Sequence, residues 1–157
     1  MTKPNMRLLA TFIVGLLYAG FGFAQKQEPS MPYHAKGTFT VQIKPLDPPP
    51  AEGLQRMSID KTISGDLVGT SKGEMFSGGD PKQGIAGYVA MEVVTGTLAG
   101  RHGSFALQHS ATMTPEGREL SVIVVPGSGT GDLKGIRGSF DIMISGGQHS
   151  YDFAYTI

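Results

Sequence analysis

The segment Thr38-Phe39-Thr40-Val41-Gln42-Ile43 decides the fold class, because polar and apolar side chains alternate along it with a period of two. Successive side chains of a strand point to opposite faces, so this pattern predicts a strand with one buried face. Seven more runs are rich in β-branched or aromatic residues and end near glycine or turn residues: 57–63, 67–76, 88–95, 105–113, 120–125, 140–144 and 151–155. The sequence therefore predicts an all-β domain, a single eight-stranded antiparallel barrel.

A short repeat supports this strand count. The segments SGDLVG (64–69), TGTLAG (95–100) and TGDLKG (130–135) are three copies of one pattern, in a chain with 23 glycines among 157 residues. Glycine adopts backbone angles that other residues avoid, so each copy predicts a strand reversal. We expect the shared leucines, Leu67, Leu98 and Leu133, to plug one end of the barrel.

The first residues predict export. Lys3 and Arg7 precede an uncharged apolar run, Gly22-Phe23-Ala24 offers a cleavage site, and a polar segment follows. We expect a signal peptide at 1–24, a flexible leader at 25–33 and the barrel domain at 34–157, in a periplasmic or extracellular protein. The alternative is a retained membrane anchor, but the run is short and glycine-rich for a span. No stable membrane insertion is expected after cleavage.

Composition excludes several classes of partner and cofactor. Thirteen basic and thirteen acidic side chains cancel, so no field recruits nucleic acid, and the absence of cysteine excludes disulfides. The four histidines show no short paired spacing, so neither a metal nor a cofactor is expected. A metal site made of Glu92, His109 and His149 would need all three on one barrel face. The sequence indicates no oligomeric state.

Three segments resemble a bacterial family, domain of unknown function 3224. They are MEVVTGTLAGRHGSFALQH (91–109), VVPGSGTGDL (124–133) and GQHSY (147–151). The resemblance covers residues 34–157 and implies an eight-stranded antiparallel barrel like that of the plant allene oxide cyclases. It implies no established activity and assigns no catalytic residue.

Glu92 and His109 are the candidate catalytic pair. A turn centred near Gly100-Arg101 would place them opposite each other on neighbouring strands, on a face that continues through Tyr88 and Phe105. Burial and pairing shift the proton affinities of both groups, so the pair could act as general acid and base. The alternatives are a purely structural buried hydrogen bond, or a face that points to solvent, because Val89, Met91 and Val93 make the opposite face apolar too.

A second candidate set lies on the last strand, where His149, Tyr151, Phe153 and Tyr155 share one face. They predict either an aromatic wall for a ligand or ordinary core packing. The predicted ligand-binding residues are Tyr88, Phe105, His149 and Tyr151.

Three functions remain open at this point. The first is binding of a small apolar ligand inside the barrel, which has room for packed side chains or for one small molecule. The second is an isomerase or cyclase that uses Glu92 and His109. The third is a non-catalytic envelope or interaction module that acts through its rim loops, residues 45–53 and 78–84.

Overall fold

The computed structural model describes residues 31–157 of the chain. The predicted signal peptide (1–24) and the first leader residues (25–30) lie outside the described part. Eight strands are present: β1 (Tyr33–Leu46), β2 (Leu54–Gly65), β3 (Leu67–Asp80), β4 (Ile85–Leu98), β5 (Arg101–Thr114), β6 (Gly117–Val124), β7 (Arg137–Ser145) and β8 (Gln148–Thr156). Two short 3-10 turns, η1 (Pro81–Gln83) and η2 (Gly131–Leu133), lie in the connections. Across residues 31–157, no helix has the length and apolar character needed to cross a membrane.

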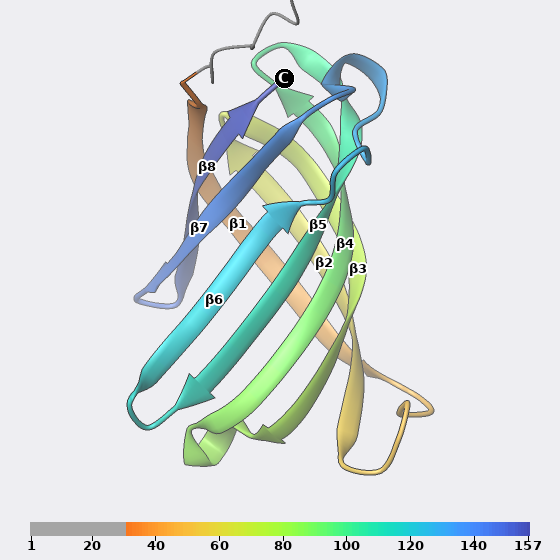
Figure 1. Cartoon of the computed structure of the whole chain (residues 1–157), viewed down its shortest axis with the longest axis vertical. Coiled ribbons are helices and arrows are strands. Elements are labelled where there is room, and N and C mark those ends of the chain that lie inside the picture. Colours follow the sequence, from red (N-terminus) through yellow and green to blue (C-terminus); the bar gives the residue numbers. More distant parts are fainter. Residues whose placement is uncertain (1–30) are drawn as a thin grey trace, which may run out of the picture.

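The strands form one closed antiparallel barrel in which each strand neighbours the next in sequence and β8 pairs with β1 (Figure 1). The predicted fold class and strand count are therefore confirmed. Most strands are longer than predicted, because their ends lack the clean alternation that marked their centres. β1 begins at Tyr33, which pairs with Tyr155, so the last residue of the predicted leader belongs to the sheet.

The seam between β6 and β7 is the weakest part of the wall. These strands share a single register pair, Ile123 with Ser139, whereas the other neighbours pair along most of their length. The β6–β7 connection bonds to β5 instead: the Thr130 amide donates to the Ser104 carbonyl at 2.8 Å, and the Ala106 amide donates to Ser128 Oγ at 3.0 Å. The glycine-rich segment at 126–131 thus completes the sheet where β7 does not.

One end of the barrel, here called the closed end, is packed solid. Leu67, Leu98 and Leu133 are each at most 1% exposed there, which confirms the predicted leucine plug. Phe140 and Phe153 stack with ring centroids 4.0 Å apart, and Phe105 stacks on Phe153 at 5.6 Å. Stacked rings and leucines together fill this half of the interior.

The opposite end, here called the open end, carries the loops between β1 and β2, β3 and β4, β5 and β6, and β7 and β8 (Figure 1). Both predicted rim segments, 45–53 and 78–84, lie at this end. Along β1, inward residues become more exposed toward it, because Ala35 is 2% exposed and Ile43 is 47% exposed. The interior is therefore packed at one end and accessible at the other.

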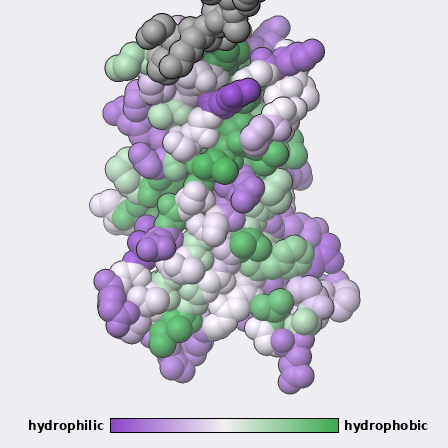
Figure 2. Space-filling model, viewed as in Figure 1, coloured by the Kyte–Doolittle hydropathy of each residue, from purple (hydrophilic) through white to green (hydrophobic). Residues whose placement is uncertain are grey.

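The structure shows which of the two apolar faces of β4 points into the barrel. Ala90, Glu92 and Val94 are at most 3% exposed and face inward, whereas Val89 and Met91 are about half exposed on the outer wall. Apolar side chains also remain on the outside elsewhere; Figure 2 shows hydrophobic residues across the middle of one face and hydrophilic residues towards its ends. The face that contains Glu92 lines the interior, as the catalytic hypothesis requires.

We expect Leu98→Ala to lower the free energy of unfolding by about 2–5 kcal/mol, because it leaves a cavity in the closed end. The matched change Val68→Ala removes a side chain that is 58% exposed and should cost less than about 1 kcal/mol. Urea unfolding of the purified proteins measures both values. Equal losses for the two variants would contradict the plug.

Candidate functional site

Four inward side chains from adjacent strands form the polar cluster: Lys61 on β2, Ser71 on β3, Glu92 on β4 and His109 on β5. Glu92 is 2% exposed and His109 4% exposed. Gly73 lies directly opposite Glu92, and a Cβ there would come within 2.6 Å of the Glu92 Cβ. Glycine at this position leaves the space in which the Glu92 side chain enters the interior.

Both carboxylate oxygens of Glu92 are occupied. Oε1 accepts a bond from Lys61 Nζ at 2.6 Å and contacts His109 Nε2 at 2.9 Å, while Oε2 accepts a bond from Ser71 Oγ at 2.7 Å. A buried charge is tolerated only when it is paired and hydrogen-bonded, and this carboxylate meets both conditions.

These partners keep Glu92 ionised. Burial by itself raises the pKa of this carboxyl group, but the bond from His109, the charge and bond of Lys61 and the bond from Ser71 outweigh burial. Together they lower the pKa of Glu92 from 4.5 to about 2. Glu92 therefore has no proton to donate near neutral pH and acts as a hydrogen-bond acceptor.

The predicted contact between Glu92 and His109 exists, but the predicted register is wrong by two residues. Glu92 is opposite Leu107, and His109 is opposite Ala90. The turn is centred on Ala99-Gly100, whose φ angles of 49° and 77° suit a two-residue hairpin, and not on Gly100-Arg101. A shift of two keeps both side chains on one face, so the long side chains still meet across the diagonal.

A cavity of about 320 Å³, here called the interior cavity, lies between the polar cluster and the open end. Every one of the eight strands contributes to its wall. The lining residues are Phe39, Val41, Ile43, Ile59, Lys61, Met75, Tyr88, His109, Ala111, Arg118, Leu120, Ile142, Ile144 and His149. Lys61 and His109 belong to this lining, whereas Glu92 and Ser71 stand behind them.

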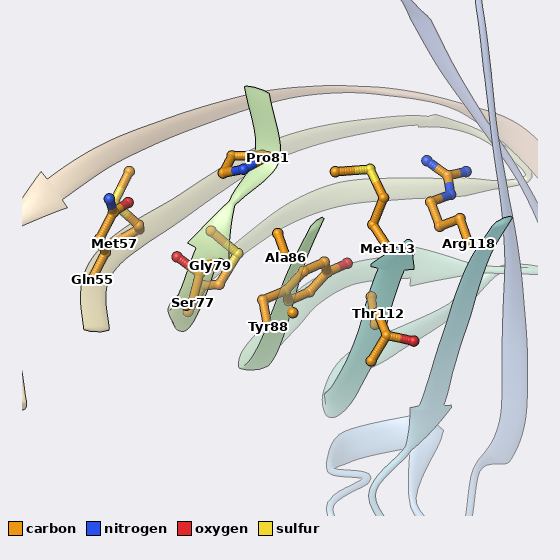
Figure 3. A pocket seen from close by; sticks show the side chains of 14 residues that line it. Gln55, Met57, Ser77, Gly79, Pro81, Ala86, Tyr88, Thr112, Met113 and Arg118 are labelled. Carbon is orange, nitrogen blue, oxygen red and sulfur yellow. The ribbon is translucent and has the colours of Figure 1, made fainter. Parts of the chain in front are cut away.

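A second cavity of about 380 Å³, here called the mouth cavity, adjoins the first at the open end. The two share Met75, Tyr88, Ala111 and Arg118. Its lining residues belong to β2, β3, β4, β5, β6 and η1. Figure 3 shows Gln55 of β2 and Arg118 of β6 at opposite sides of this group of side chains. The mouth cavity thus connects the interior cavity with the rim of the barrel.

The structure separates the four predicted ligand-binding residues into two pairs. Tyr88 and His149 line the interior cavity, and His149 packs against Phe39 with ring centroids 5.0 Å apart. Phe105 and Tyr151 instead belong to the packed core at the closed end. The Tyr151 hydroxyl already has a partner there, because it accepts a hydrogen bond from the Leu67 amide at 3.1 Å. Only Tyr88 and His149 are placed to touch a molecule in the cavity.

Sequence reasoning missed Lys61, Ser71 and Arg118. The inward position of Lys61 could have been predicted, because it lies between Ile59 and Ile63 in the alternating pattern of buried residues. A charged residue at such a position requires a buried partner of opposite charge. Ser71 and Arg118 carry no comparable signal.

Among the described residues, no group of three His, Cys, Asp or Glu side chains is arranged to hold a metal ion. The considered triad of Glu92, His109 and His149 is not such a group. The polar cluster is an ion pair with two hydrogen-bonding neighbours.

Comparison with known proteins identifies a protein family and a related solved structure. The family described as "Protein of unknown function (DUF3224)" matches residues 35–155. A crystal structure of a DUF3224-family protein of unknown function from Shewanella oneidensis MR-1 is 42% identical and has a TM-score of 0.73. The match covers 80% of this chain and 97% of that one. No curated protein matches the chain.

We expect Glu92→Gln to lower the free energy of unfolding by about 3 kcal/mol at neutral pH, because the ammonium of Lys61 loses its buried counter-charge. The pH dependence should change as well. A pKa lowered from 4.5 to about 2 stabilises the folded state above pH 4.5, and this stabilisation is lost as the pH falls toward 2. The wild type should therefore lose about 3 kcal/mol more than Glu92→Gln across that interval, as measured by urea unfolding.

The control for this experiment is Glu119→Gln on β6, where the side chain is exposed. It should leave both the stability at pH 7 and its pH dependence close to those of the wild type. Parallel pH profiles for the wild type and Glu92→Gln would contradict a low pKa for Glu92.

Proposed function

Because this chain belongs to the DUF3224 family of proteins of unknown function, we propose a function from its own interior: the open half of the barrel binds one small, largely apolar molecule. The observation that carries this proposal is the interior cavity, to which all eight strands contribute. Ligand pockets are typically concave, mostly apolar and equipped with a few polar groups that fix orientation.

The lining has this composition. Nine of its members are apolar: Phe39, Val41, Ile43, Ile59, Met75, Ala111, Leu120, Ile142 and Ile144. The other five are Lys61, Tyr88, His109, Arg118 and His149. Lys61 and His109 belong to the polar cluster, whereas Tyr88 and Arg118 also line the mouth cavity. The apolar wall supplies affinity through burial of ligand surface, and the polar groups supply orientation.

Access supports the same proposal. The interior and mouth cavities share part of their lining, so a molecule can reach the interior from the rim of the open end. The closed end offers no such route, because stacked aromatic rings and the three plug leucines fill it. A ligand would therefore enter between the loops of the open end and stop at the polar cluster.

We propose further that the protein acts in the periplasm or outside the cell, on the basis of the signal-peptide pattern in residues 1–24. N-terminal sequencing of the exported protein tests this part separately. A chain that starts at Gln25 supports it, and an uncleaved chain retained in the cytoplasm contradicts it.

Ala111→Phe should weaken binding of an uncharged apolar fluorophore, N-phenyl-1-naphthylamine, at least tenfold. Ala111 lines both cavities, so a phenyl ring there occupies the space that the probe needs. The matched control is Ser110→Phe, which puts the same ring on the exposed outer face of β5. Fluorescence titration gives both affinities, and thermal unfolding checks that the variants fold.

Native mass spectrometry of the purified protein tests the proposal without a probe. A co-purifying small molecule that is absent from Ala111→Phe supports binding in the interior. A protein that is always empty and binds N-phenyl-1-naphthylamine equally well in both variants would contradict it. That result would favour the module that acts through its rim loops.

A further inference from the structure

The side chains of Lys61 and His109 form the inner end of the interior cavity, here called the floor. Lys61 and His109 line the cavity, and Glu92 lies behind them. The Lys61 ammonium is 2.6 Å from Glu92 Oε1, and its side chain is only 10% exposed. The positive charge of Lys61 and the negative charge of Glu92 therefore offset each other within the polar cluster.

The hydrogen-bonding role of His109 follows from its partner. An ionised carboxylate only accepts hydrogen bonds, so Nε2 of His109 must carry the proton in its 2.9 Å contact with Glu92 Oε1. In a neutral imidazole the other nitrogen, Nδ1, is then an acceptor. Glu92 thereby sets the tautomer of the ring that faces the ligand space.

Nδ1 of His109 is open to the cavity. Among residues 31–157, every fully buried side-chain nitrogen or oxygen has a hydrogen-bond partner. His109 bonds through Nε2, and no bond to its Nδ1 occurs in this part of the chain. Nδ1 must therefore reach accessible space, and the space that the His109 side chain lines inside the barrel is the interior cavity.

Lys61 provides the complementary donors. An ammonium group has three N–H donors, and the side-chain bond of Lys61 goes to Glu92. The ammonium also lies over the Phe39 ring, 4.9 Å from its centroid, at the wall of the same cavity. The Lys61 ammonium and Nε2 of His109 both contact Oε1 of Glu92, so the two side chains that line the floor meet at one carboxylate oxygen, with Nδ1 on the other side of the imidazole ring.

We propose that this floor recognises an uncharged hydroxyl group, so that the ligand is a small apolar alcohol or phenol. Its O–H donates to Nδ1 of His109, and its oxygen accepts from Nζ of Lys61. This inference rests on the proposed binding function and adds the chemical class of the ligand.

Two other ligand classes fit the floor less well. A carboxylate at the floor would lie near the negative charge of Glu92, which already balances Lys61. A plain hydrocarbon would displace water and leave Nδ1 and Nζ without partners, which is costly in an apolar site. A hydroxyl group satisfies both atoms and adds no charge.

Three probes with the same ring system test the proposal: 2-naphthol, 2-methylnaphthalene and 2-naphthoate. They differ only in the group that would meet the floor. We expect 2-naphthol to bind the wild-type protein at pH 7 about tenfold more tightly than 2-methylnaphthalene, and more tightly than 2-naphthoate. Fluorescence titration gives the three dissociation constants.

The variant His109→Phe keeps a planar ring and removes Nδ1, so the preference for 2-naphthol over 2-methylnaphthalene should fall to about twofold or less. The matched control His102→Phe makes the same substitution at an exposed histidine of the closed end and should preserve the tenfold preference. The ¹⁵N resonance of His109 Nδ1 in the wild type should also shift on addition of 2-naphthol. That measurement keeps the test valid if His109→Phe does not fold.

The outcomes separate this inference from the proposed function. Equal affinity for 2-naphthol and 2-methylnaphthalene, or tightest binding of 2-naphthoate, would overturn the hydroxyl assignment and leave apolar binding in place. A preference for 2-naphthol that survives in His109→Phe would place the hydroxyl group elsewhere and overturn the assignment. Failure of all three probes to bind would overturn the binding function, and this inference with it.

Discussion

Closure of the sheet is the constraint on which the rest of this structure depends. Eight strands enclose one interior, and alternate residues of every strand must point into it. At the closed end, large rings and leucines satisfy this requirement by filling the space. Toward the open end the inward residues include Val41, Ala111 and flexible side chains such as Met75, and space remains between them. The cavity is thus a consequence of which side chains occupy the inward positions at each level of the barrel.

The polar cluster marks the boundary between these two halves. Glu92 would be costly as a lone buried charge, but three other strands each bring it one partner at hydrogen-bond distance. The same contacts orient the two side chains that line the cavity. Lys61 is held by its charge, and the His109 ring is held in one tautomer by an acceptor-only partner. One carboxylate therefore organises the floor of the cavity without lining it.

The fold could be predicted from sequence because its signals are local. Alternation within each segment predicts a strand, and the repeated glycine turns mark where the chain reverses. Short connections then favour pairing between strands that follow each other in sequence. The orientation of β4 could also have been predicted from its neighbour β5. Gln108 and Ser110 make one face of β5 polar, so the other face, with Leu107 and His109, points inward, and the face of β4 beside it points inward too.

The strand registers, the partners of Glu92 and the division of the aromatic residues could not be predicted, because they depend on how separate strands align and pack. Placing the turn one residue late shifted the β4–β5 register by two, which preserved the face and lost the true opposite neighbours. The contribution of Lys61 and Ser71 required the registers of β2, β3 and β4 to be known together. The division of the aromatic residues between packed core and cavity depends on packing at each level of the barrel. Phe105 and Tyr151 point inward like the residues that line the cavity, so the sequence pattern could not separate the two groups. Both side chains belong to the packed core of the closed end.

This division between halves gives the barrel separate places for stability and for recognition. The residues with the least exposure include Leu67, Leu133 and Phe153, which lie at the closed end and line neither the interior cavity nor the mouth cavity. The loops of the open end and the flared strand ends beside them contribute little to that core, so their residues can differ without loss of the fold. Under the proposed binding function, the polar floor at the boundary limits how deep a ligand can enter and determines which chemical group it presents there. If the proposed ligand binds there, the open half limits its size, and Glu92, acting through Lys61 and His109, determines the polar group that fits its inner end.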